Sequence, residues 1–235
     1  IHGIHETGNS ELWLASVGMG IIKARIKSVG STVVLEDIRH YAINNKDFES
    51  NYFFSIFAEN DSTIFFANKG YGVFTYHAAA DGLIPFFSNS YQNASLNNVL
   101  TMDKDSLGNY LFGTTAGLIK YKSENSYELF DTQEGFPNNT VHDIIKTKGC
   151  SFWLSTNLGL INFDTERKIF RSYGYNDGLS VTEFSDGASY LDEKSNTLFF
   201  GGVNGFVSIQ ANGKPEEVYL PPVYFSQLSI FGEQH

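Results

Sequence analysis

The sequence predicts an all-β fold, a β-propeller made of four-stranded blades, from two observations about how it repeats. A motif consisting of an aromatic-rich apolar run, two small residues and a closing glycine occurs five times in 235 residues. The closing glycines are 52, 45, 42 and 46 residues apart, which is a typical length for one propeller blade. They are Gly20, Gly72, Gly117, Gly159 and Gly205.

Each motif predicts a β-hairpin that supplies the two middle strands of one blade. In the fourth copy, residues 153–156 and 160–163 are β-prone runs on either side of the tip Asn157-Leu158-Gly159. Glycine stands where a hairpin tip needs a left-handed backbone. The first two copies have one more residue and two glycines each, at 17–20 and 69–72, and predict the same hairpin with a longer tip.

The two residues immediately before the tip have small side chains in nearly every copy. Blades converge toward a common axis, so we expect the taper of their facing surfaces to require small side chains there. The pairs are Ala15 and Ser16, Ala67 and Asn68, Gly113 and Thr114, Ser155 and Thr156, and Gly201 and Gly202.

The other strands of each blade lie before and after the hairpin. Upstream candidates, each separated from the hairpin by polar turn residues, are 52–58, 99–103, 141–146 and 184–191. Downstream candidates include 127–130 and 169–173. This spacing predicts four strands per copy, about twenty in all. Residues 37–45 are ambiguous, and the pattern ends after the fifth closing glycine.

Composition supports a packed core and argues against several partners. Hydrophobic residues make up 42% of the chain and 36 residues are aromatic, which is not the composition of a disordered protein. The formal charge of −10, without a cluster of Lys or Arg, makes nucleic acid and anionic lipid poor partners. No membrane segment is expected, because no apolar run approaches the roughly 18 residues of a membrane helix. Cys150 is alone, so no intramolecular disulfide is expected.

Residues 109–118 and 152–164 resemble the two-component regulator propeller repeat. Residues 177–206, followed by Pro221-Pro222, are similar to the last blade and the following linker in periplasmic sensor regions of hybrid two-component system histidine kinases. The resemblance covers nearly the whole chain. It implies that residues 1–212 are propeller blades, and that 213–235 are a linker and the start of a Y_Y_Y-type immunoglobulin-like domain.

The resemblance also implies a function. The chain would be an extracytoplasmic ligand-sensing segment, periplasmic and part of an inner-membrane receptor, without catalysis of its own. The expected ligands are glycan-derived oligosaccharides, and the parent protein would be a homodimeric histidine kinase that regulates transcription. Because family members usually carry more than five repeats, we interpret the chain as part of a longer protein and a larger ring. A closed ring of five blades is the alternative.

Most motifs that suggest chemistry have a simpler structural explanation. Asp103, Asp105 and Gly108 match the first, third and sixth places of a calcium loop, but the ligand place at Leu107 and the twelfth place at Thr114 do not fit. An acidic turn is expected instead. The Gly-x-Gly tips lack the third glycine of a phosphate-binding loop. We expect no metal and no cofactor.

Two rival functions come from other classes of protein. Glu183 and Asp186 could be the carboxylate pair of a propeller glycosidase or lyase, although Glu183 also follows the turn pattern of the family. A passive protein-interaction scaffold would bind no small molecule at all. No catalytic residue is assigned.

One candidate binding surface remains, on the end of the ring where the interblade turns and the hairpin tips open together. Amide and hydroxyl groups beside an aromatic ring suit a neutral sugar, although asparagine is also common in turns. The candidate ligand-binding residues are Tyr71, Asn97, Asn98, Thr115, Asn138, Asn139, Asn157, Glu183 and Asn204.

Overall fold

A computed structural model describes residues 1–42, 50–79, 81–88, 94–123, 126–211, 229–230 and 233–234. Within this part of the chain the fold is all-β, as predicted, with two short 3-10 helices, η2 (Ala94–Asn97) and η3 (Tyr175–Asp177). A two-stranded sheet of β20 (Ser229–Ile230) and β21 (Glu233–Gln234) follows the blades. The predicted boundary at 212/213 and the Pro221-Pro222 linker lie outside the described residues.

Five antiparallel sheets follow one another along the chain, and each corresponds to one copy of the motif. Blade 1 contains β1 (Gly3–Glu6), β2 (Glu11–Ser16), β3 (Gly20–Val29) and β4 (Thr32–Tyr41). Blade 2 contains β5 (Phe53–Asn60), β6 (Thr63–Asn68), β7 (Gly72–His77) and β8 (Gly82–Phe87). Blade 3 contains β9 (Val99–Lys104), β10 (Tyr110–Thr114), β11 (Gly117–Ser123) and β12 (Ser126–Phe130).

Blade 4 contains β13 (Val141–Lys146), β14 (Ser151–Thr156), β15 (Gly159–Asp164) and β16 (Ile169–Tyr173). Blade 5 contains β17 (Phe184–Asp192), β18 (Thr197–Gly202) and β19 (Gly205–Gln210), so the described residues supply three of its four expected strands. The upstream and downstream strand predictions are confirmed to within about two residues. The ambiguous segment 37–45 is resolved in part, because β4 extends to Tyr41.

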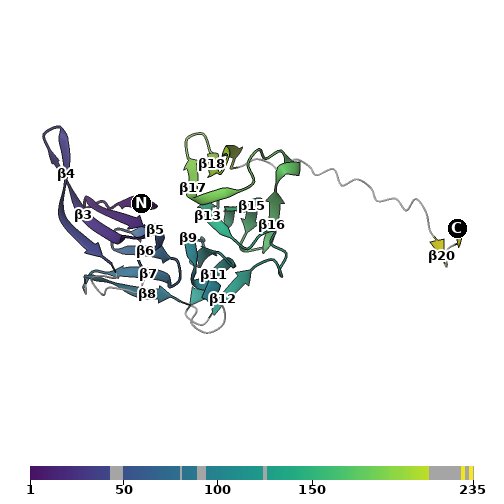
Figure 1. Ribbon diagram of the computed structural model, residues 1–235, viewed down its shortest axis with the longest axis horizontal. Coiled ribbons are helices and arrows are strands. Elements are labelled where there is room, and N and C mark those ends of the chain that lie inside the picture. Colours follow the sequence, from purple (N-terminus) through teal and green to yellow (C-terminus); the bar gives the residue numbers. More distant parts are fainter. Residues whose placement is uncertain are drawn as a thin grey trace.

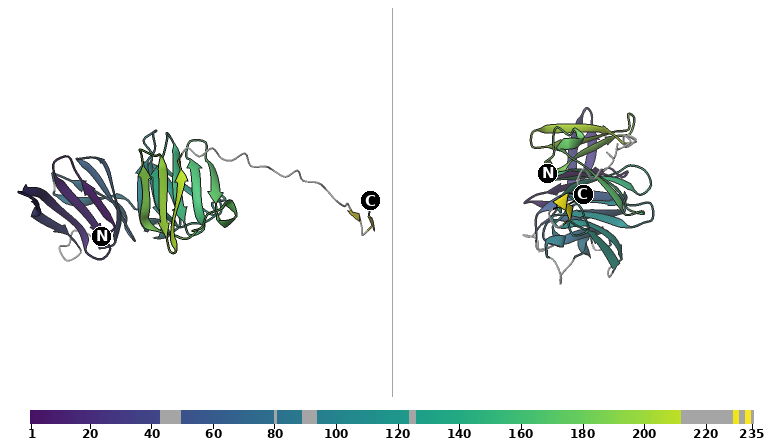
Figure 2. Two further views of the ribbon diagram at one scale, coloured as in Figure 1. Left: turned by 90° about the horizontal axis from the view of Figure 1, so that it is seen from above. Right: turned by 90° about the vertical axis from the view of Figure 1, so that its right-hand side faces the viewer.

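The blades form a propeller in which the first strand of each sheet is the inner one. Strands within a blade pair in chain order. Figure 1 shows the five sheets arranged around a common space, with β5, β9, β13 and β17 toward the middle. In Figure 2 the strands of all blades run broadly between the same two ends of the ring.

Apolar cores lie between successive blades, and the motif assigns each side chain to one of them. The second residue of the motif faces the following blade, as Trp13 does against Phe66 in the core between blades 1 and 2. Phe65, Leu111 and Trp153 repeat this placement in the next three cores. Because side chains alternate along a strand, the residues on either side of the second position face the preceding blade.

Two blade faces are left uncovered in the described part of the chain. On blade 5, Tyr190 and Phe206 are each 65% exposed, and both rings contact Phe199, the second residue of the fifth motif. On blade 1, Ile4 is 69% exposed and lies in a row with Leu14. No apolar core of the described residues joins blades 1 and 5. We call these two surfaces the open faces.

The closing glycine is required by both conformation and space. Its φ is positive in all five copies, for example +105° at Gly159. A Cβ on Gly159 would lie 2.0 Å from the carbonyl oxygen of Tyr173, the last residue of the outer strand of the blade. Blades 1, 2 and 3 repeat this approach with Tyr41, Phe87 and Phe130. The predicted hairpin, and the reason for its glycine, are therefore confirmed.

The small pair before the tip has two explanations rather than the single one predicted. Taper accounts for the first position, since a Cβ on Gly113 would lie 2.5 Å from Thr101 Cγ2 of its own blade and 2.9 Å from Val141 Cγ1 of the next. The second position instead closes the tip. The Thr156 hydroxyl donates to the carbonyl of Gly159 (2.9 Å) and accepts from the N–H of Leu158 (3.0 Å). Thr114 and Ser16 do the same in blades 3 and 1.

Candidate functional site

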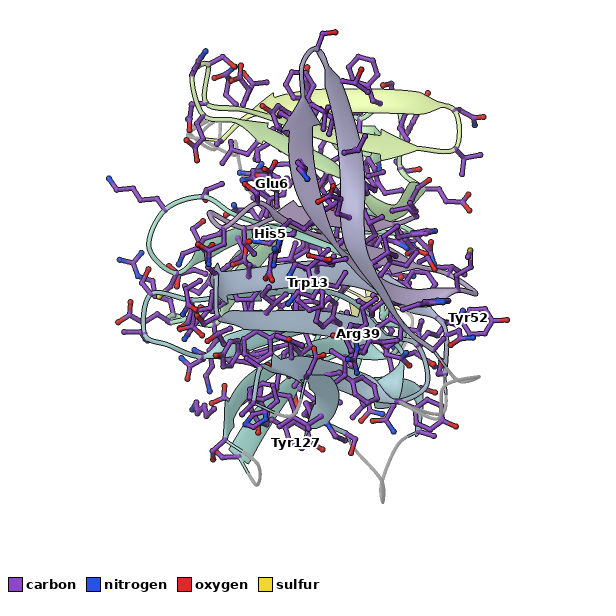
Figure 3. The ribbon with its side chains drawn as sticks, turned by 90° about the vertical axis from the view of Figure 1, so that its left-hand side faces the viewer. His5, Glu6, Trp13, Arg39, Tyr52 and Tyr127 are labelled. Atoms are coloured by element: carbon purple, nitrogen blue, oxygen red, sulfur yellow. The ribbon has the colours of Figure 1, made fainter. Side chains whose placement is uncertain are left out.

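The hairpin tips and the interblade turns meet at one end of the ring, which we call the tip end. The backbone N–H of Gly18 donates to the carbonyl of Asn51, just before blade 2. Gly70 donates in the same way to Asn97, and Gly159 to Thr182. Each of these bonds joins the tip of one blade to the turn that leads into the next. Figure 3 shows Tyr52 extending outward at this end of the ring.

The candidate ligand-binding residues all lie at the tip end, in three groups. The first group spans blades 2 and 3. Tyr71 is 40% exposed at the tip of blade 2, and its neighbour Lys69 forms a bridge with Asn98. Thr115 donates its backbone N–H to Asn98 and its hydroxyl to the Ser95 carbonyl. The tip that carries the exposed Tyr71 is therefore joined through its backbone to a turn with half-buried amide groups.

The second group is used for turn formation. Asn138 Oδ1 accepts a hydrogen bond from the N–H of Thr140 at 2.8 Å, and Asn139 Oδ1 accepts one from the N–H of Thr132 at 2.8 Å. These contacts are the ones that asparagine makes in turns, so the side-chain oxygens of Asn138 and Asn139 are already engaged.

The third group surrounds a charged cluster that the sequence did not reveal. Asn157 and Asn204 are exposed at the tips of blades 4 and 5, and the carbonyl of Glu183 accepts from the tip of blade 5. Asn157 Oδ1 lies 2.6 Å from His142 Nε2, and Asp186 Oδ1 lies 2.5 Å from His142 Nδ1. We call His142, Asp186 and Asn157 the mouth cluster.

Bulges at the start of the inner strands place this cluster. In blades 2, 3 and 4 the inner strand carries one extra residue relative to its partner, at Phe54, Leu100 and His142. In blade 5 the extra segment is longer, since residues 185–188 lie between the paired residues Phe184 and Ser189. A bulge redirects side chains at the end of a strand, which allows Asp186 of blade 5 to reach His142 of blade 4.

The mouth cluster favours a charged histidine. Burial opposes the charge, but hydrogen bonds to Asp186 and Asn157 outweigh it and raise the pKa of His142 above its usual value. Both ring nitrogens face oxygen atoms, and only the protonated ring can donate from both.

One position further along the inner strands, polar residues face each other across the axis. Ser55, Thr101, Asp143 and Ser189 occupy this position in blades 2 to 5, and we call them the inner belt. The Asp143 carboxylate accepts from Thr101 Oγ1 at 2.8 Å and from Ser189 Oγ at 2.6 Å, and so links three blades. Burial is the main cause that raises the pKa of Asp143.

A sequence signal for the inner belt exists, although it was missed. Every belt residue precedes the first small residue of its motif by twelve positions, as Asp143 precedes Ser155 and Ser55 precedes Ala67. Gly3 has the same spacing in blade 1. The motif therefore locates the inner-belt residue of each blade, even where the inner strand itself shows no clear alternation of apolar and polar residues.

The suspected calcium loop is a turn, as expected. Asp105 accepts hydrogen bonds from the N–H groups of Leu107 and Asn109 and from the Asn109 side chain, all within 2.9 Å. Burial acts against the charge, but these bonds outweigh it and lower the pKa of Asp105. In the described part of the chain no group of three or more His, Cys, Asp or Glu side chains could hold a metal ion.

The strand order and the inner belt define the class of protein, a β-propeller, and solved structures share this fold. The extracellular domain of the putative hybrid two-component system BT3049 from B. thetaiotaomicron matches 95% of this chain and 29% of its own length, with a TM-score of 0.78 and 24% identity. Virginiamycin B lyase from Staphylococcus aureus matches 88% of this chain and 64% of its own length, with a TM-score of 0.65 and 16% identity. An enzyme shares the fold, so the fold does not decide function.

Sequence comparison points to the same kind of receptor. Histidine kinase P4 of Formosa agariphila is 33% identical over 119 residues, which are 50% of this chain and 8% of that protein. The resemblance to sensor regions of two-component proteins is therefore confirmed, and the chain spans a small part of the relatives that it matches. No family model matches the sequence. No helix among the described residues is long and apolar enough to cross a membrane.

Proposed function

We propose that this chain is an extracytoplasmic ligand-sensing segment of a hybrid two-component receptor, and that it binds glycan-derived oligosaccharides at the tip end. The resemblance to histidine kinase P4 and to the BT3049 extracellular domain supports the receptor assignment. The parent protein would be a homodimer in the inner membrane, with these blades in the periplasm. Binding would act by favouring one arrangement of the dimer over another, and so regulate transcription.

The observation that carries the ligand assignment is the surface around Tyr71. Tyr71 is exposed on a hairpin tip whose backbone, through Lys69 and Gly70, contacts the turn of Asn97 and Asn98, and Thr115 contacts the same turn. Sugars present apolar C–H faces that stack on aromatic rings, and hydroxyls that pair with amides. The formal charge of −10 favours neutral over acidic oligosaccharides.

The test is calorimetric titration of this chain with a panel of neutral glycan oligosaccharides. We expect Tyr71→Ala to weaken binding severalfold, up to about tenfold, because stacking on an aromatic ring contributes roughly 0.5 to 1.5 kcal/mol. Leu107→Ala, at an exposed turn remote from the hairpin tips, is the control and should bind like the parent chain. Equal affinities of the parent chain and Tyr71→Ala would show that this surface is not the site.

The same mixtures of chain and oligosaccharide test the rival hypothesis that the chain is a glycosidase or lyase. Glu183 and Asp186 do lie together at the tip end, which is the one observation in favour of a glycosidase or lyase. Asp186, however, is bonded to His142 rather than free to act on a substrate. Release of shorter sugars that is lost in Glu183→Gln would establish catalysis and overturn the sensor proposal.

A further inference from the structure

The inner strands line a wide-open cavity on the axis of the ring, which begins one residue further along the strands than the mouth cluster. Its volume is about 400 Å³, and residues of β5, β9, β13 and β17 line it. All four residues of the inner belt are in the lining, together with Asp103 and Lys146. Each inner strand pairs with one neighbour in its sheet, so its other backbone edge faces this space.

The polar groups of the lining are mostly acceptors. Thr101 and Ser189 each donate their only hydroxyl hydrogen to Asp143, and therefore offer lone pairs to any other group. Asp143 also accepts from the N–H of Ile144 at 2.9 Å, which leaves one acceptor site on Oδ2. A ligand that bonds to these side chains must bring donors.

The charges of the lining residues are also not balanced. Asp103 and Asp143 both face the cavity, and no Lys or Arg of the described chain lies within ion-pair distance of Asp143. Lys146, the cation of the lining, donates its Nζ to the carbonyl of Lys104 at 2.9 Å. The protonated ring of His142 acts on Asp143, but it also pairs with Asp186. The carboxylates around the cavity therefore still outnumber the cations, and a further cation is favoured there.

Ser55 supplies an independent sign of a missing partner. Its hydroxyl oxygen is shielded from solvent and has no hydrogen-bond partner in the described part of the chain. A buried polar atom in that state is rare in folded proteins. Ser55 lines the cavity, so a ligand there can provide the absent bond once the side chain turns its hydroxyl toward the opening.

We propose that the axial cavity binds a small primary ammonium compound that carries hydroxyl groups, of the amino sugar or amino alcohol class. The ammonium group lies against Asp143, and a hydroxyl pairs with Ser55. A metal ion fits less well, because no cluster of three metal-ligating side chains exists among the described residues. An anion is disfavoured by the two carboxylates.

The volume agrees with this class of ligand. About 400 Å³ lies in the range of small-molecule sites and accommodates a compound the size of a monosaccharide. The proposal does not depend on the oligosaccharide surface around Tyr71, and the two sites can fail separately.

The test compares glucosamine, glucose and N-acetylglucosamine by calorimetric titration at about pH 6, where the free amine is protonated. The three sugars share one ring and differ in a single substituent. We expect glucosamine to bind at least tenfold more tightly than the other two. Equal affinities for all three sugars, or no binding of glucosamine, would overturn the proposal.

Substitutions test whether glucosamine binds in the axial cavity. Asp143→Asn should reduce the affinity for glucosamine at least tenfold, and Ser55→Ala, a milder change, should reduce it severalfold with an unchanged circular dichroism spectrum. Glu166→Gln, an exposed carboxylate on the turn after β15, is the matched control and should bind normally. Tyr71→Ala should also leave glucosamine binding unchanged. Unaltered affinity in folded Ser55→Ala and Asp143→Asn would refute the site.

Discussion

At the scale of single residues, the carboxylate of Asp143 holds together parts of the chain that no backbone ladder connects. Its partners Thr101 and Ser189 lie 42 and 46 residues away, on the blades to either side. No backbone ladder joins one sheet to the next, and beyond the backbone contacts of the hairpin tips it is side chains that link the blades near the axis. Asp143 therefore contributes both to the packing of the blades and to the acidity of the axial cavity.

His142 should make the stability of the ring depend on pH. Its pKa is raised in the folded state, so the folded chain binds the proton more tightly than the unfolded chain. The stabilisation is complete below the usual pKa of about 6.5 and is lost as pH rises through the folded value. Asp186 and Asp143 are the acidic groups acting on it, and the raised pKa of Asp143 acts in the same direction at lower pH.

The measurement is a set of thermal unfolding curves between about pH 5.5 and 8 for the parent chain and for His142→Gln. We expect the difference in Tm to be largest at the acidic end and to shrink as pH rises. Asp186→Asn should behave like His142→Gln. Curves that stay parallel across this range would contradict a charged His142.

At the scale of elements, the hairpin of blade 4 combines three requirements in about ten residues. Its second residue covers the following blade, its small pair fits the axis and closes the tip, and its glycine lies against the outer strand. These requirements act on neighbouring positions, so the motif is recognisable in the sequence.

Gly159→Ala should be strongly destabilising. The substituted residue would have to keep a φ near +105°, with its Cβ 2.0 Å from the Tyr173 carbonyl. We expect the free energy of unfolding to fall by about 3 kcal/mol or more.

Gly174→Ala is the matched control, because that glycine has an extended φ of −137° and no atom lies within 4 Å of the place where the alanine methyl group would stand. Urea denaturation of the two variants measures both changes. Similar losses of stability in Gly159→Ala and Gly174→Ala would mean that the close approach to Tyr173 is not the reason why residue 159 is a glycine.

The sequence predicted the regular elements well and the bulges not at all. Strand 169–173 and the hairpins follow from alternation and turn residues, which are local properties. His142 reads as one more polar residue in an alternating strand, because a bulge is defined by the pairing partner and not by the strand itself. Similarly, the tip residues could be placed from the turns, whereas the contact between His142 and Asp186 depends on the packing of two blades.

At the scale of the whole molecule, the open faces are the least satisfied surfaces of the ring. Each of the four interblade cores buries the second residue of one motif, but in the described part of the chain no following blade covers Phe199 in the fifth motif. Apolar sheet faces of this kind associate with other surfaces in water. The larger ring interpreted from the sequence would cover them with further blades.

We expect this chain, studied by itself, to self-associate through the open face of blade 5. Phe206→Asp should shift the population toward monomer, because a charge in that face has to be desolvated on association. Sedimentation velocity at several concentrations measures the shift. Leu107→Asp, on an exposed turn outside both open faces, is the control. A chain that is monomeric before any substitution would contradict the expectation.

The order of cores along the chain has a consequence for how the chain folds as it emerges, from its N-terminal end onward. Every interblade core joins residues of one repeat to those of the next, with closing glycines only 42 to 52 residues apart. A nascent chain can therefore complete one core each time a further blade emerges, without waiting for distant segments. At every stage, the most recently folded blade exposes the apolar face that will contact the next blade, until the following forty or so residues fold and cover it.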